Sequence, residues 1–150
     1  MKILRKYTWT TGLKTHPVVL LIFMLIALLS FPLHAQHDLQ GLTSEWSITQ
    51  HKDLASGAIT NKGSLVVLTD QELSWGPSTD EMATMEVNGV RGKWNKAKNL
   101  GKMVYDVTMD DGRGKVTFFG TTKGISIRID LTYNNGSSHL LLTCSSVKYQ

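Results

Sequence analysis

The feature that most limits the fold of this chain is a strict alternation of apolar and polar residues near its C-terminal end. Over residues 125–133 every second residue is apolar, and the residues between are polar; residues 103–110 show a closely similar pattern. A β-strand points successive side chains to opposite faces, so this spacing gathers the apolar ones on one face, whereas a helix would scatter them. Both stretches therefore predict strands with one buried face.

Shorter stretches with similar composition predict further strands at residues 45–50, 64–69, 72–75, 82–88, 92–97, 115–119 and 140–147. Between them lie turn sequences. Asp110-Asp111-Gly112 and Asn134-Asn135-Gly136 are typical of tight hairpins, and Asn88-Gly89 predicts another turn. Residues 53–60 are predicted to hold one short helical turn.

About eight or nine short strands joined by turns predict an all-β domain built as an antiparallel meander. A closed barrel is favoured because closure removes the two exposed sheet edges, and a sandwich is the alternative. Residues 36–150 are enough for a single domain with one core.

The first 35 residues have the pattern of a secretory signal: a cationic start, an apolar run over residues 18–29, and Ala35 before a cut that makes Gln36 the new N-terminus. The cations are Lys2, Arg5, Lys6 and Lys14. A membrane-spanning helix needs about 20 residues, and the apolar run extends at most over residues 18–33. We therefore expect an exported protein, periplasmic or extracellular; the alternative is an uncleaved tether to the inner membrane.

The net charge of the chain comes from this leader. The whole chain carries +4, but four cations and no acid precede residue 36, which leaves twelve basic and twelve acidic residues. We therefore expect no nucleic-acid partner, and contact with a membrane only through the N-terminal segment. A balanced charge is compatible with a weak homodimer. The single cysteine, Cys144, is expected to be a buried strand residue rather than a reactive thiol.

The familiar catalytic, nucleotide-binding and metal-binding motifs are absent from the sequence. His37, His51 and His139 follow the leader and could hold zinc, but loop histidines are usually solvated. Asp106 and Asp130 could serve a hydrolase as a pair of carboxylates, the least favoured alternative. We expect no cofactor, no bound metal and no enzymatic activity.

Aromatic side chains are spread over nearly every predicted strand. The candidates to line a cavity for an apolar ligand are Trp46, Trp75, Tyr105, Phe118 and Tyr133. The alternative is that they fill the core, and Trp46 is well placed to close one end of it.

A basic stretch could instead form a surface patch for a partner. Its candidate residues are Arg91, Lys93, Trp94, Lys96 and Lys98, with the indole as a stacking platform. The alternative is a lysine-rich edge that resists unwanted strand pairing.

The domain opens with Gly41-Leu42-Thr43-Ser44-Glu45-Trp46, followed by a meander of short strands. This layout resembles the lipocalin-like small barrels of exported bacterial proteins, in which a glycine and a tryptophan lead into the first strand. The resemblance implies a barrel architecture and no particular ligand.

Together these features favour an exported, non-catalytic binding domain that holds a small apolar or amphipathic ligand inside a β-barrel. The alternative is a protein- or glycan-binding β-sandwich that acts as an envelope adaptor or inhibitor. A void inside the domain would favour the first hypothesis, and a filled interior would favour a surface function.

Overall fold

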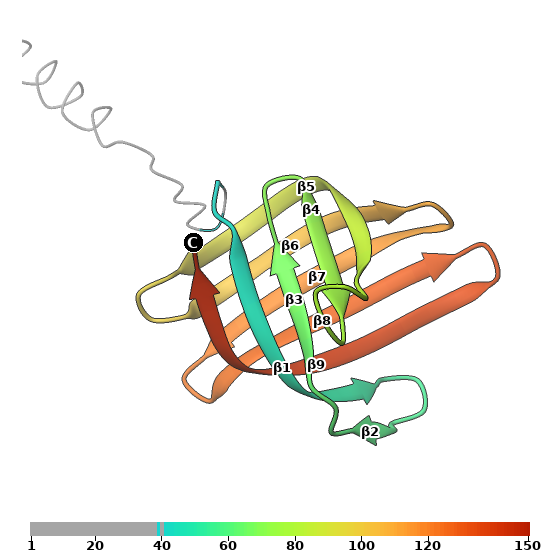
Figure 1. Ribbon diagram of the computed structural model, residues 1–150, viewed down its shortest axis with the longest axis horizontal. Coiled ribbons are helices and arrows are strands. Elements are labelled where there is room, and N and C mark those ends of the chain that lie inside the picture. The colour runs from blue at the N-terminus through green and yellow to red at the C-terminus, as the bar shows by residue number, and fades with distance from the viewer. Residues whose placement is uncertain (1–38, 40) are drawn as a thin grey trace, which may run out of the picture. The chain divides into compact units, whose positions relative to one another are not determined.

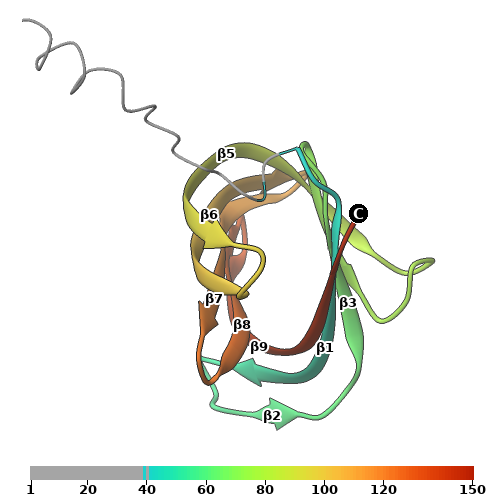
Figure 2. The same cartoon turned by 90° about the vertical axis from the view of Figure 1, so that its left-hand side faces the viewer.

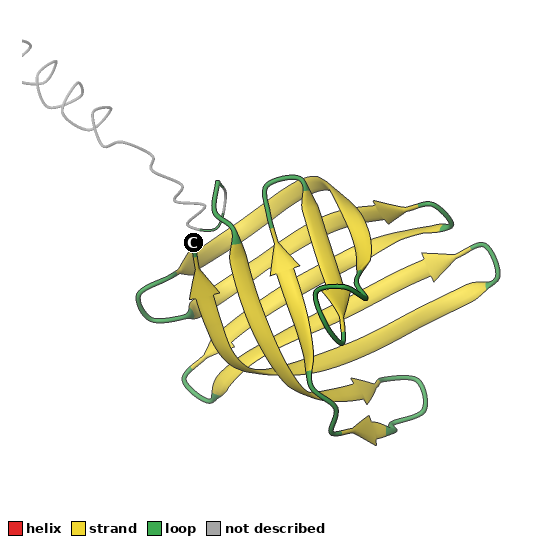
Figure 3. Cartoon of the chain, in the orientation of Figure 1, coloured by secondary structure: helices red, strands yellow, loops and turns green. Residues whose placement is uncertain are grey.

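The computed structural model describes Leu39 and residues 41–150, so the predicted leader and its cut lie outside the described residues (Figure 1). The described chain consists of strands and the loops that join them (Figure 3). The strands are β1 (Ser44–Asp53), β2 (Ile59–Thr60), β3 (Ser64–Leu68), β4 (Glu72–Gly76), β5 (Ala83–Asn95), β6 (Leu100–Met109), β7 (Gly112–Thr121), β8 (Gly124–Tyr133) and β9 (Gly136–Tyr149). None of the described segments is a helix long and apolar enough to cross a bilayer.

Eight of these strands form a closed antiparallel barrel. Each strand from β3 to β8 pairs with the next one along the chain, and β1 pairs with both β3 and β9. The short β2 lies outside the ring and pairs only with His51 and Lys52 at the end of β1 (Figure 2). The predicted all-β meander is confirmed, and the closed barrel rather than the sandwich is the architecture.

The two alternating stretches form β6 and β8, and their apolar faces point inward as predicted. Ile127 and Ile129 on β8 are fully buried, and Tyr105 on β6 is 2% exposed. Register aligns Tyr105 with Val116 and Val116 with Ile129, so one layer of the core crosses three strands. Burial of such side chains supplies the main stabilisation in a domain without a disulfide.

One predicted turn is wrong. Residues 82–88 and 92–97 belong largely to a single strand, β5, and Asn88 is an extra residue that interrupts its register with β6. A β-bulge of this kind keeps the strand continuous while it changes which residues face the core. Before the bulge Met85 is buried, and after it Trp94 is buried. The Asn88 amide Nδ2 donates a hydrogen bond of 2.9 Å to Thr108 Oγ1 on β6.

The short helical turn predicted at residues 53–60 is present as a single i→i+4 turn between β1 and β2. The Asp53 carboxylate accepts bonds from the backbone N–H groups of Ala55 (2.8 Å) and Ser56 (2.7 Å), and the Gly57 N–H donates to the Asp53 carbonyl. The aspartate side chain thus caps this single turn in the way that an N-cap residue begins a helix.

Aromatic side chains fill one end of the barrel, which we call the filled end. The Trp46 ring lies 4.8 Å from Phe118, 5.5 Å from Trp94 and 6.0 Å from Tyr149 between ring centroids. Its indole N–H donates a 3.0 Å bond to Ser44 Oγ, and the Trp94 N–H donates a 2.9 Å bond to the Tyr149 hydroxyl. Because both indole donors are paired, the rings can be buried without an unpaired polar group.

Candidate functional site

The five aromatic residues predicted to line a cavity divide into two groups. Trp46 and Phe118 are fully buried and Tyr105 is 2% exposed, and they contact one another or the same core side chains. A void large enough for a ligand would expose the side chains around it, so the barrel is filled at this level. Trp75 and Tyr133 are only partly buried and lie elsewhere.

Tyr105 is nevertheless unusual for a core residue. Its hydroxyl is buried without a hydrogen-bond partner within the described part of the chain. Burial raises the pKa of Tyr105 well above its ordinary value, so the hydroxyl stays protonated.

Tyr133 lies at the turn between β8 and β9 and packs close to Gly112 on β7. It lines a separate surface pocket of about 480 Å³ with Asp110, Asp111 and Asn134. It therefore does not share a cavity wall with Trp75.

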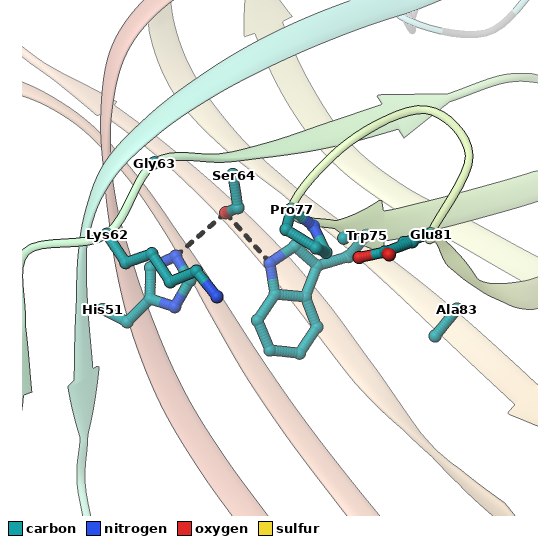
Figure 4. A pocket seen from close by; sticks show the side chains of 9 residues that line it. His51, Lys62, Gly63, Ser64, Trp75, Pro77, Glu81 and Ala83 are labelled. Carbon is teal, nitrogen blue, oxygen red and sulfur yellow. Dashed lines mark hydrogen bonds between the residues drawn. The ribbon is translucent and has the colours of Figure 1, made fainter.

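Trp75 lines a pocket of about 380 Å³ where β1 and β4 end and β3 and β5 begin (Figure 4). Small-molecule sites have volumes of roughly 300–1,000 Å³. The lining is mainly apolar and is interrupted by a few polar groups. The residues around it are His51, Lys62, Gly63, Ser64, Trp75, Gly76, Pro77, Glu81 and Ala83. We call it the mouth pocket.

A single hydroxyl holds the two rings of the mouth pocket in place. The Trp75 indole N–H donates a 3.2 Å bond to Ser64 Oγ, and Ser64 Oγ lies 2.9 Å from His51 Nε2. The hydroxyl accepts from Trp75 and still has its own proton, which it can donate to His51 Nε2 when that nitrogen is unprotonated. The rings of His51 and Trp75 lie 5.7 Å apart at an angle of 59°. This chain of bonds orders the pocket wall before any ligand arrives.

The surroundings of His51 favour its neutral form. Burial lowers the pKa of His51, and the nearby Lys62 ammonium lowers it further. Neutral His51 is the form that can accept the Ser64 proton. Lys62 and Glu81 flank the Trp75 indole in Figure 4, so the rim carries one charge of each sign.

Gly76 sets the position of the loop that forms one wall. A Cβ at this position would collide with the backbone carbonyl of Glu81 and with Met82 Cα. Only glycine lets residues 77–82 fold back this closely against the end of β4. At Gly63, on the opposite side of the pocket, a Cβ would have room.

The residues of the predicted basic patch do not share one surface. Trp94 is 2% exposed and bonded inside the filled end, so its ring is not offered to a partner. Arg91, Lys93 and Lys98 are exposed, and Lys96 lies with its ammonium 5.4 Å from the Tyr149 ring centre. The cations thus lie on the surface while the predicted stacking platform is in the core.

Asp106 and Asp130 lie on the outer face and line the same surface pocket, with Lys115 in register between them. The Arg91 guanidinium lowers the pKa of Asp106, and the Arg128 guanidinium lowers that of Asp130. An acid–base pair for glycoside hydrolysis needs one carboxyl with a raised pKa. Both groups here are held ionised by arginines.

The histidines that follow the leader do not come together. His37 lies outside the described residues, His51 lies in the mouth pocket, and His139 Nδ1 contacts Asp130 at 2.8 Å on the outer face. Across Leu39 and residues 41–150 no three potential ligands are grouped to hold a metal ion.

Cys144 lies in the core with 8% exposure, and its thiol donates to the Ser146 carbonyl at 3.0 Å. Burial raises the pKa of Cys144 to about 11, so little thiolate forms near neutral pH. This placement agrees with the expected buried strand residue.

The sequence predicted Trp75 as a candidate, and Trp75 lines the mouth pocket, but the sequence analysis missed the side chains around it. His51, Ser64 and Gly76 are separated from one another in sequence and meet only through the pairing of β1 with β3 and of β3 with β4. The one local signal was Gly76-Pro77, which marks a sharp change of direction directly after Trp75.

No family model, curated protein or solved structure matches this chain.

Proposed function

We propose that this protein is a non-catalytic binding barrel that takes a small, flat, amphipathic ligand in the mouth pocket. The ligand lies against the Trp75 and His51 rings rather than deep inside the barrel. The observation that supports this most is the ring pair held by Ser64 at the wall of a pocket of about 380 Å³.

The wall is suited to a ring-shaped ligand for two reasons. First, indole and imidazole faces give a large apolar contact area, and aromatic pairs stack with favourable geometry. Second, both rings are already fixed by hydrogen bonds to Ser64. A preordered wall loses little conformational entropy on binding, which leaves more of the contact energy for affinity.

The charged residues at the rim of the mouth pocket suit a ligand with an anionic group. Lys62 stands close enough to the ring pair to lower the pKa of His51, so its ammonium acts on the same space that a ligand would occupy. Glu81 lies in the loop on the other wall. We propose that the ligand carries an anionic group paired with Lys62.

The filled interior also supports the mouth as the site. Trp46 and Phe118 occupy the space that a deeply bound ligand would need. We propose that the protein acts in the periplasm or outside the cell, on the basis of the secretory pattern of residues 1–35.

The experiment is a titration of residues 36–150 with 2-naphthoate, which joins a flat apolar ring system to one carboxylate. Quenching of tryptophan fluorescence or calorimetry should show saturable binding. Lys62→Met should weaken it at least severalfold, and Trp75→Ala should abolish it.

The matched control is Lys52→Met, because Lys52 lies near the pocket on β1 but does not line it. Equal binding of naphthalen-2-ylmethylammonium would show that Lys62 does not select charge. Full binding by Trp75→Ala would refute the site itself.

A further inference from the structure

The cations of the folded barrel are unevenly distributed. Residues 87–105 and 112–129 contain no aspartate or glutamate, although acids and bases are balanced over residues 36–150. The turn that joins β5 to β6 and the turn that joins β7 to β8 both fall within these acid-free stretches.

The two turns leave the barrel at the same end. Gly101 at the start of β6 is in register with Gly120 at the end of β7, so the chain segments beyond them are neighbours. Both turns project to the left in Figure 1, and Figure 2 looks onto this side. We call this the basic end, and its cations are Lys93, Lys96, Lys98, Lys102 and Lys123.

The lysines of the basic end are not neutralised by the protein. Within the described chain, the ion pairs formed by lysine or arginine involve Arg91, Arg128 and Lys148. Lys93 and Lys102 are direct cross-strand partners, an arrangement of like charges that destabilises a sheet. Lys102 lies over the Phe119 ring at 5.4 Å and Lys96 lies over the Tyr149 ring. Lys96 is half-buried, and the other four lysines are exposed.

Acidic residues lie in the turns at the opposite ends of β5 and β6. The turns there contain Asp80, Glu81, Asp110 and Asp111. The barrel is thus neutral as a whole, but the β5–β6 and β7–β8 turns are basic and the β4–β5 and β6–β7 turns are acidic. A field of this kind orients the molecule toward a charged surface.

We propose that the basic end docks on a lipid surface bearing anionic headgroups, independently of the predicted N-terminal leader. The cations are lysines, which act as point charges, rather than arginines, which recognise single carboxylate or phosphate groups through paired bonds. They are divided between two separate turns, and a planar array of phosphates can contact both at once. Their charge complements such a surface.

The test is co-sedimentation of residues 36–150 with vesicles, because the barrel and its core close within the described residues. One set of vesicles contains equal parts of phosphatidylglycerol and phosphatidylcholine, and the other contains phosphatidylcholine alone. Each lysine near an anionic bilayer contributes about fivefold in affinity, equivalent to about 1 kcal/mol. Replacing Lys93, Lys98 and Lys123 by glutamine should therefore weaken binding to the anionic vesicles about a hundredfold.

The matched control replaces Lys52, Arg113 and Lys115 by glutamine, which removes the same charge away from the basic end. This variant should lose much less affinity than the basic-end variant. Circular dichroism should show that both keep the wild-type strand content.

Equal loss in the two variants, or equal binding of wild type to both kinds of vesicle, would overturn the proposal. So would tighter binding to soluble polygalacturonate, which would indicate an acidic glycan instead. Self-association at low salt that the basic-end variant abolishes, without vesicle binding, would identify a second copy of the chain as the partner. None of these outcomes bears on the mouth pocket.

Discussion

The filled end and the mouth pocket share one interaction, an indole N–H group that donates to a hydroxyl, but they differ in what surrounds it. At the filled end the Trp46 indole donates to Ser44 and the Trp94 indole donates to Tyr149. At the mouth the Trp75 indole donates to Ser64. Each hydroxyl satisfies an indole N–H that would otherwise be costly to bury.

The difference lies in what else the hydroxyl contacts. Ser44 is fully buried beside Trp46, so that pair only supports packing. Ser64 also contacts His51, a titratable ring at the edge of a pocket. The same indole–serine bond thus lies inside a packed core at Trp46, where other aromatic rings surround it, and at the wall of an open pocket at Trp75.

The largest expected effect is at the filled end. Trp46→Ala should lower the free energy of unfolding by about 3–5 kcal/mol, because it leaves a cavity among Phe118, Trp94 and Tyr149. Trp75→Ala should cost clearly less, since its side chain is only partly buried. Urea denaturation of both variants measures the difference, and an equal loss would break the distinction between the two ends.

Gly76→Ala should come next. The added Cβ collides with the Glu81 carbonyl, so the loop over the pocket must shift, at a cost of about 1–3 kcal/mol. We expect 2-naphthoate binding to fall sharply as well. Gly63→Ala is the control, because it lines the same pocket with room for a Cβ, and a matching loss there would contradict this explanation.

Replacing single indoles by phenyl rings tests separately what each indole N–H contributes to stability and to binding. Trp94→Phe removes the donor to Tyr149 and should lower stability by about 1–2 kcal/mol while leaving naphthoate binding intact. Trp75→Phe removes the donor to Ser64 and should mainly weaken binding. Denaturation and calorimetry on the same two proteins would show the crossed pattern, and parallel changes would argue against it.

The smallest expected effect is a dependence of the folding stability on pH through His51 in the mouth pocket. Because folding lowers the pKa of His51, the unfolded chain binds this proton more tightly, so stability is full above the ordinary value of 6.5 and falls as the pH drops below it. Protonation also removes the acceptor for the Ser64 hydroxyl. The variant His51→Gln should have a flatter stability profile than wild type in this range, and superimposable profiles would refute the assignment.

The barrel itself could be predicted from the sequence because alternation is a local property. The patterns at residues 103–110 and 125–133 fix which side chains face inward, and the hairpin turns fix the neighbours. Closure then follows from the need to pair the two outer edges.

The candidate site could not be predicted as readily, because bulges change the inward face without a clear signal in the sequence. Register between β1 and β9 skips Thr49, so His51 rather than Gln50 continues the inward row of Trp46 and Ile48. The bulge at Asn88 has the same effect on Trp94. One local clue was available, since Arg91 and Lys93 on one face of a strand place Trp94 on the other.

The most direct test of the account is the nuclear magnetic resonance spectrum of the three indole N–H groups in ¹⁵N-labelled residues 36–150, recorded during addition of 2-naphthoate. Tryptophan-to-phenylalanine variants assign the signals of Trp46, Trp75 and Trp94. The account predicts a saturable shift of the Trp75 signal while the other two stay in place. A shift of Trp46 with Trp75 unchanged would contradict it, because the ligand would then lie inside the barrel.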